Sequence, residues 1–249
     1  MSIMLRIAWL EAKLLLREPM TLVFTLGLPV VMELVMGGVF GNTAEAGFYR
    51  GVGAMDYYMG AYVGLVIAAL GLISLPTHLA NYRERGLLRR FDASSIPRWS
   101  LFGAQALVMV TLASVGAVLV VIVGNIAYDL TAPVSLGLVV LAFLIAALAF
   151  AAIGVLLGVS MPTARAAQGA GILLWFVMLI LGGAGPPPEV LSTGMRAVGS
   201  ATPLKHVVTL IQDPWLGFGW NGAETGIVVA CLIGAVALIA TVTRHQSDR

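Results

Sequence analysis

The sequence predicts an all-α polytopic membrane protein, folded as a single domain over residues 1–249. Of the 249 residues, 59% are hydrophobic and only 10% are charged, whereas soluble domains carry about 25% charged residues. The mean hydropathy is +0.97. The apolar residues also form six long windows that are almost free of charge, and a membrane helix needs about 20 such residues.

The chain starts with a segment that is too charged to span a membrane, "MSIMLRIAWLEAKLLLREP". At about 100° per residue, its basic side chains share one side of a helix and lie beside an apolar face. Helices of this kind lie in the membrane interface. Residues 1–19 are therefore predicted as an interfacial helix with four anchoring residues, Arg6, Trp9, Lys13 and Arg17. The alternative is a cytoplasmic extension of the first span.

Six transmembrane helices follow in the charge-bounded windows. They are predicted at residues 20–41, 57–80, 99–128, 134–160, 166–185 and 225–243. An even number of spans places both termini on one side of the membrane. If that side is the inside, eleven of the fourteen Lys and Arg residues fall on inner segments and three on outer ones. This asymmetry follows the positive-inside rule and predicts a multi-pass plasma-membrane protein with both termini cytoplasmic.

The outer segment between spans five and six is too polar to span and too apolar for an ordinary loop. Thr202 is expected to be an N-cap with Pro203 as the first helical residue. Apolar residues then repeat at helical spacing until Pro214, which is expected to end the helix. With a weaker stripe before it, this segment predicts two short outer helices. They dip into the outer leaflet or pack on the spans, and surface packing alone is the alternative.

No residue pattern in the sequence indicates catalysis. A P-loop needs Gly-Lys-Ser/Thr, and neither Lys13 nor Lys205 follows a glycine. The histidines, His78, His206 and His245, are far apart and show no metal-ligand spacing. The net charge of +2 is too small to indicate nucleic-acid binding. We therefore expect no enzyme activity, no cofactor or metal on this chain, and no nucleic-acid partner.

The loop after the second span, "NYRERGLLRRFDASSIPRW", holds five of the fourteen Lys and Arg residues. Gly86 permits a turn, and Pro97 ends any helix before it. Leu87 and Phe91 stand at i, i+4 spacing and form an apolar knob rimmed by arginines. One interpretation is a short cytoplasmic helix that docks on a partner, because arginine forks bind carboxylates at interfaces. The other is a topology anchor that contacts acidic lipid.

At these residues the chain resembles the permease subunits of ABC-2 type exporters, the family that includes daunorubicin-resistance-like drug and lipid exporters. The loop "YRERGLLRRFDASSIPRW" matches the family pattern through Glu84, Gly86 and Pro97. The outer segment "PPPEVLSTGMRAVGSATPLKHVV" and the N-terminal "WLEAKLLLREP" also match, so the resemblance covers the whole chain. One departure is Ile96, which stands where the family usually has Ser or Thr.

This resemblance implies a function and its partners. Two permease copies, identical or homologous, would form a dimer in the lipid membrane and bind cytoplasmic ABC ATPase subunits that hold ATP and Mg. The complex would export hydrophobic or amphiphilic substrates, such as drugs, lipids or glycolipids. The residues implied in ATPase coupling are Arg83, Glu84, Arg85, Gly86, Leu87, Leu88, Arg89, Arg90 and Phe91.

One acidic residue lies deep in a predicted span. Glu33 stands thirteen residues after Met20, or about 20 Å along a helix, and Pro29 removes a hydrogen bond to the Thr25 carbonyl. An ionisable residue inside the membrane indicates a functional site, so Pro29 and Glu33 are predicted on the translocation path or at the dimer seam. A structural hydrogen bond to a neighbouring helix is the alternative. Two competing functions remain: a stand-alone proton-coupled carrier that uses Glu33, and a structural or assembly protein.

Overall fold

The computed structural model of the chain describes residues 3–17, 19–44, 47–87, 97–186 and 190–247. Helices dominate these residues, and the prediction of an all-α polytopic membrane protein is confirmed. The elements are α1 (Ile3–Leu16), α2 (Pro19–Phe40), the 3-10 turn η1 (Tyr49–Gly51), α3 (Ala54–Ala69), the π-helical turn η2 (Leu70–Ser74), α4 (Leu75–Glu84), α6 (Arg98–Tyr128), α7 (Leu136–Ser160), α8 (Ala164–Leu181), α9 (Thr193–Ser200), α10 (Pro203–Leu216) and α11 (Gly222–Ser247).

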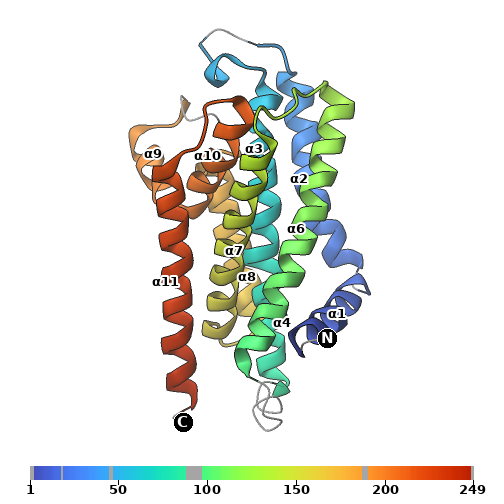
Figure 1. Cartoon of the computed structure of the whole chain (residues 1–249), viewed down its shortest axis with the longest axis vertical. Helices are drawn as coiled ribbons and strands as arrows, with labels where there is room; N and C mark the ends of the chain where they lie inside the picture. Colours follow the sequence, from blue (N-terminus) through green and yellow to red (C-terminus); the bar gives the residue numbers. More distant parts are fainter. Residues whose placement is uncertain (1–2, 18, 45–46, 88–96, 187–189, 248–249) are drawn as a thin grey trace.

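The long helices run side by side along one axis (Figure 1). Both chain termini lie toward the lower end of the bundle in this view, and the short helices α9 and α10 lie at its upper end. We keep the names lower end and upper end below. The chain crosses between the two ends repeatedly. Helix α4 ends and α6 begins at the lower end, and the turn that joins α7 to α8 also lies there (Figure 1).

Helix α1 lies at an angle to the long helices, at the lower end of the bundle (Figure 1). Its buried residues Ala8 and Leu15 pack with Ala104 and Val108 of α6. These four side chains are small or medium-sized, which lets the two helices approach closely. α1 is therefore attached to the bundle along one stripe, and α2 begins directly after it, where the sequence predicts the first span.

The centre of the bundle is one continuous rod formed by α3, η2 and α4. It covers Ala54–Glu84, which is longer than the predicted 57–80, and 94% of its most apolar window is buried inside the protein. Every residue of α3 is buried. The rod contains a π-helical turn at Leu70–Ser74. Such turns occur mostly as single-turn bulges inside α-helices and are frequent at functional sites. The other long helices surround this rod.

The outward faces of the surrounding helices carry large apolar side chains, and Ile126, Leu173 and Ile233 are all more than 60% exposed. Such a surface suits lipid rather than water. Among the residues that the structure describes, five stretches are long and apolar enough to cross a membrane: Ala54–Glu84, Trp99–Tyr128, Leu136–Ser160, Ala164–Leu181 and Gly222–Arg244. In α2 the apolar stretch found, Thr25–Phe40, is shorter, so a count of six spans stays a prediction.

Helix α10 begins where the sequence predicts, with Thr202 at the N-cap and Pro203 as the first residue. The expectation that Pro214 ends it is wrong, because α10 continues to Leu216 and stops before Gly217. A proline removes one backbone donor, whereas Gly217 has a φ of 86°, a left-handed conformation that commonly ends helices. α10 is largely buried against α3, α7 and α11, so it packs on the long helices.

Candidate functional site

The predicted coupling segment continues from α4 at the lower end of the bundle. Residues 88–96 lie outside the described part of the chain, and with them four members of the predicted set, Leu88, Arg89, Arg90 and Phe91. Just after α4, Gly86 has a φ of 67°, a conformation that glycine adopts without steric cost. Leu87 follows it and is partly exposed. The chain therefore turns away from α4 immediately before the proposed apolar knob.

Arg83 points into the protein rather than toward a partner. Its Nη1 atom donates to the carbonyl oxygens of Gly158, Val159 and Met161, at 3.1, 2.7 and 2.8 Å. These groups belong to the end of α7, where the last carbonyls of a helix have no partner within the helix. The guanidinium also places a positive charge at the negative end of the helix dipole. The sequence did not predict this capping role for Arg83.

Glu84 contacts the beginning of α8. Its Oε1 atom accepts a hydrogen bond of 3.0 Å from the backbone N–H of Ala164, the first residue of α8. The Thr163 hydroxyl accepts a second one from Ala166. Arg85, by contrast, is exposed, and its Nε atom donates to the Asn81 side chain of α4 at 3.0 Å. Of the described residues of the predicted set, Glu84 and Arg85 are exposed, and Arg83 and Leu87 are partly exposed.

A buried acidic residue that was not predicted from the sequence lies beside this segment. Glu11 of α1 is 7% exposed and accepts a 2.8 Å hydrogen bond from the Tyr82 hydroxyl of α4. Burial raises the pKa of Glu11 above its ordinary value, and the hydrogen bond from Tyr82 opposes part of that rise. Glu11 shares a helix face with Ala8 and Leu15, the residues that pack on α6, and this spacing was the signal that could have found it.

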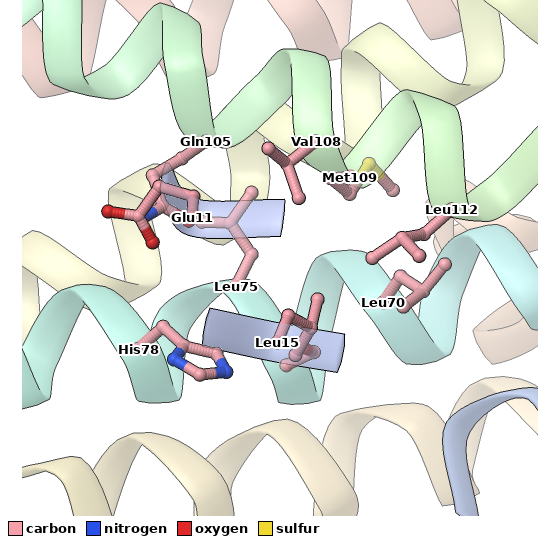
Figure 2. Close-up of a pocket in the computed structure, with 10 residues that line it drawn as sticks. Glu11, Leu15, Leu70, Leu75, His78, Gln105, Val108, Met109 and Leu112 are labelled. Atoms are coloured by element: carbon pink, nitrogen blue, oxygen red, sulfur yellow. The ribbon is translucent and has the colours of Figure 1, made fainter. Parts of the chain in front are cut away.

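The Glu11 side chain borders a small cavity between α1, α4 and α6 (Figure 2). Figure 2 shows Glu11, Gln105 and His78 at one end of it and Leu70 and Leu112 at the other. The cavity volume is about 20 Å³, and a water molecule needs about 10–15 Å³ with several polar partners. The cavity therefore has room for a single water molecule at its polar end. It is too small for an organic substrate.

The predicted interfacial residues of α1 lie on its outer side. Arg6, Lys13 and Arg17 are exposed, and so is Trp9 at 61%. The Lys13 Nζ atom lies 5.0 Å from the centre of the Trp9 ring, within the range of a cation–π interaction. A tryptophan beside cationic groups suits the boundary between lipid and water, so this geometry agrees with an interfacial helix.

Pro29 and Glu33 lie on the buried side of α2, one turn apart. Glu33 is 0% exposed, and neither of its carboxylate oxygens has a hydrogen-bond partner among the described residues. Gly124 of α6 faces it, and a methyl group at that glycine would collide with the carboxylate. Glu33 is thus buried within one copy of the chain, and among the described residues it has no hydrogen bond to a neighbouring helix. A role of Pro29 and Glu33 on the translocation path or at the dimer seam stays a prediction.

This placement predicts opposite effects on stability for two substitutions of Glu33. Glu33→Met keeps the length of the side chain and removes a buried, unpaired polar group, so thermal stability should be unchanged or higher. Glu33→Ala leaves a cavity, and large-to-alanine changes in cores cost about 2–5 kcal/mol. The fraction of protein that remains monodisperse after heating in detergent measures both effects. A less stable Glu33→Met protein would show that the carboxylate has a stabilising partner.

The upper end is held together by a second set of polar contacts that the sequence did not predict. Arg50 donates to Asp213 of α10 at 2.6 Å, and Asn221 donates to the other oxygen of the same carboxylate at 2.8 Å. Lys205 of α10 lies 2.8 Å from Glu224 of α11. These contacts connect α10 to α11 and to the segment before α3, so they brace the upper end of the bundle.

An apolar groove opens between α6, α7 and α11. Its volume is about 210 Å³, and the side chains that line it include Trp99, Phe102, Leu148, Val155, Leu232 and Val236. Trp99 and Phe102 belong to the first turns of α6, so the groove lies toward the lower end (Figure 1). An apolar wall of this kind can accept hydrocarbon from the membrane but offers hardly any polar group to orient a charged ligand.

The comparisons with known proteins agree with this architecture. The family model described as ABC-2 type transporter matches residues 4–214, which include the predicted coupling segment, the long helices up to α8 and nearly all of α10. None of the curated proteins is similar enough in sequence to match the chain.

Proposed function

Because the chain belongs to the ABC-2 type transporter family, and is therefore the permease component of an ABC transporter, we propose that it is the permease of an ATP-driven exporter. ATP and Mg are bound by a separate cytoplasmic ABC ATPase subunit, and the permease works as a dimer in the plasma membrane. The lower end of the bundle, with both termini, faces the cytoplasm. The substrates are hydrophobic or amphiphilic molecules, such as drugs, lipids or glycolipids, moved out of the cytoplasm or inner leaflet.

The observation that carries this proposal is the position at which α4 ends and α6 begins. Both points lie at the same end of the bundle as the two termini (Figure 1), and the sequence assigns eleven of the fourteen Lys and Arg residues to inner segments. An apolar knob in an arginine-rich loop suits a soluble partner with acidic groups. The apolar groove between α6, α7 and α11 supports a hydrophobic substrate that enters from the membrane.

The stand-alone proton carrier that uses Glu33 has less support. Neither the cavity beside Glu11 nor the apolar groove is lined by Glu33. A proton-coupled carrier usually needs several ionisable groups within the membrane, and the Glu33 side chain is fully buried.

The test is purification of the full chain in mild detergent, followed by reconstitution into liposomes that contain a fluorescent phospholipid and a fluorescent cationic dye. We expect a P-loop ATPase to co-purify, and we expect ATP to drive movement of at least one of the two probes. Movement that stops with an uncoupler but continues without ATP would overturn the proposal in favour of the carrier. A chain that purifies without any ATPase would also contradict it.

A further inference from the structure

Three consecutive side chains in the last turn of α4 reach three other helices. The Tyr82 hydroxyl donates to Glu11 of α1. Arg83 donates to the last carbonyls of α7, and Glu84 accepts from Ala164, where α8 begins. Successive residues of a helix point about 100° apart, so a single turn can contact neighbours on three sides. We call residues Tyr82, Arg83 and Glu84 the junction.

The junction holds both ends of the turn between α7 and α8. Arg83 supplies donors to carbonyls that have no partner within α7, and Glu84 supplies an acceptor to an N–H that has none within α8. Each charge also has the sign that suits its helix end, positive at the C-terminus of α7 and negative at the N-terminus of α8. The turn at 161–163 is thus attached to α4 by hydrogen bonds on both of its sides.

The junction also lies next to the loop that docks on the ATPase in the proposed function. Only Arg85 and Gly86 separate Glu84 from Leu87, the first apolar residue of the proposed knob. Gly86, in its left-handed conformation, connects the end of α4 to that knob. A force applied to the loop therefore meets α4 first, and α4 is bonded at that point to α1, α7 and α8.

We propose that the junction transmits ATP-driven displacement of the docking loop to the α7–α8 turn, so that these helix ends move together with α4. This proposal rests on the proposed function, because it needs an ATPase that moves the loop. It assigns Arg83 and Glu84 a positioning role within the permease, whereas the apolar knob of Leu87 and Phe91 makes the contact with the partner. Loss of the junction should therefore uncouple the two proteins without separating them.

The test compares two forms of the full chain, each co-purified with its ATPase in lipid nanodiscs. One has the unsubstituted junction, and the other is a double variant that combines Arg83→Met with Glu84→Ala. Arg83→Met keeps the length of the side chain but removes its donors. Spin labels are attached at Arg165→Cys on α8 and Val23→Cys on α2, which are exposed positions. The single native cysteine is replaced by Cys231→Ser, so that only the two introduced cysteines are labelled. Distances between the labels are measured without nucleotide and with ATP plus vanadate.

We expect ATP plus vanadate to shift the distance between the labels when the junction is intact, and we expect most of that shift to be lost in the double variant. The ATPase should still co-purify. Arg83→Lys should recover part of the shift, because its ammonium can still donate to the α7 carbonyls. The control is Arg244→Met, which removes an exposed arginine from the lower end of α11 and should leave the shift intact.

A full shift in the double variant would overturn the junction while leaving the proposed function in place. An intact junction that shows no shift would overturn it as well, because the α7–α8 turn then does not move. Loss of the ATPase from the double variant alone would assign these residues to docking instead. Failure of the unsubstituted chain to bind an ATPase would count against the proposed function itself.

Discussion

Replacing Leu87 and Phe91 with Asp should abolish co-purification of the ATPase while leaving the permease folded in the membrane. A buried apolar side chain contributes about 1.5–3 kcal/mol, so losing two removes at least about 3 kcal/mol. Each 1.4 kcal/mol is about tenfold in affinity, which predicts a loss of at least about 100-fold. The added carboxylates should weaken binding further, since the arginines around the knob indicate a partner with acidic groups.

The control places one carboxylate, in place of an exposed apolar side chain, at the other end of the bundle. Val190 is 64% exposed and precedes α9 at the upper end, so Val190→Asp should leave ATPase association unchanged. Quantitative pull-down across a range of ATPase concentrations measures both variants. Equal binding by the double variant and the unsubstituted chain would reassign the loop to a lipid-contacting topology anchor.

The positions of the long helices could be predicted because lipid demands long windows without charge. The third window was predicted at 99–128, and α6 covers Arg98–Tyr128. The ends were harder to predict where a helix continues outside the apolar window. The central rod extends to Glu84, beyond the predicted end at residue 80, because its last turn is bonded to α1, α7 and α8 rather than surrounded by lipid.

The candidate site could be predicted only in part. The segment after α4 stood out by its arginines, yet the role of Arg83 depends on carbonyls 75 to 78 positions away. Such contacts leave no local pattern, because a guanidinium that binds a partner and one that caps a helix look alike in sequence. Glu11 is a different case. Its spacing from Ala8 and Leu15, which the structure shows to be buried, could have indicated burial, but the basic stripe is the stronger signal in the same helix and Glu11 was not predicted.

The close contact of α8 with the π-helical turn predicts a large effect from a single methyl group. A Cβ at Gly171 would collide with the backbone carbonyl of Leu72, and a backbone group cannot rotate away as a side chain can. Overpacking of this kind costs about 1–3 kcal/mol, and Gly171→Val should cost more than Gly171→Ala. Thermal unfolding midpoints in detergent measure the loss. Gly154→Ala should behave similarly, since it would meet the neighbouring carbonyl of Gly71.

Gly169 provides the control, because it lies in the same helix two residues earlier and has open space around the position of a Cβ. Alanine is favoured over glycine by up to about 1 kcal/mol inside a helix, so Gly169→Ala should leave the midpoint unchanged or raise it slightly. Gly234→Ala, also in open space, repeats the control on α11. Equal midpoints for Gly171→Ala and Gly169→Ala would mean that α8 can separate from the π-helical turn without cost. A midpoint that rises or stays equal in Gly169→Ala but falls in Gly171→Ala would show that backbone atoms fix this contact. The contact then requires glycine at position 171.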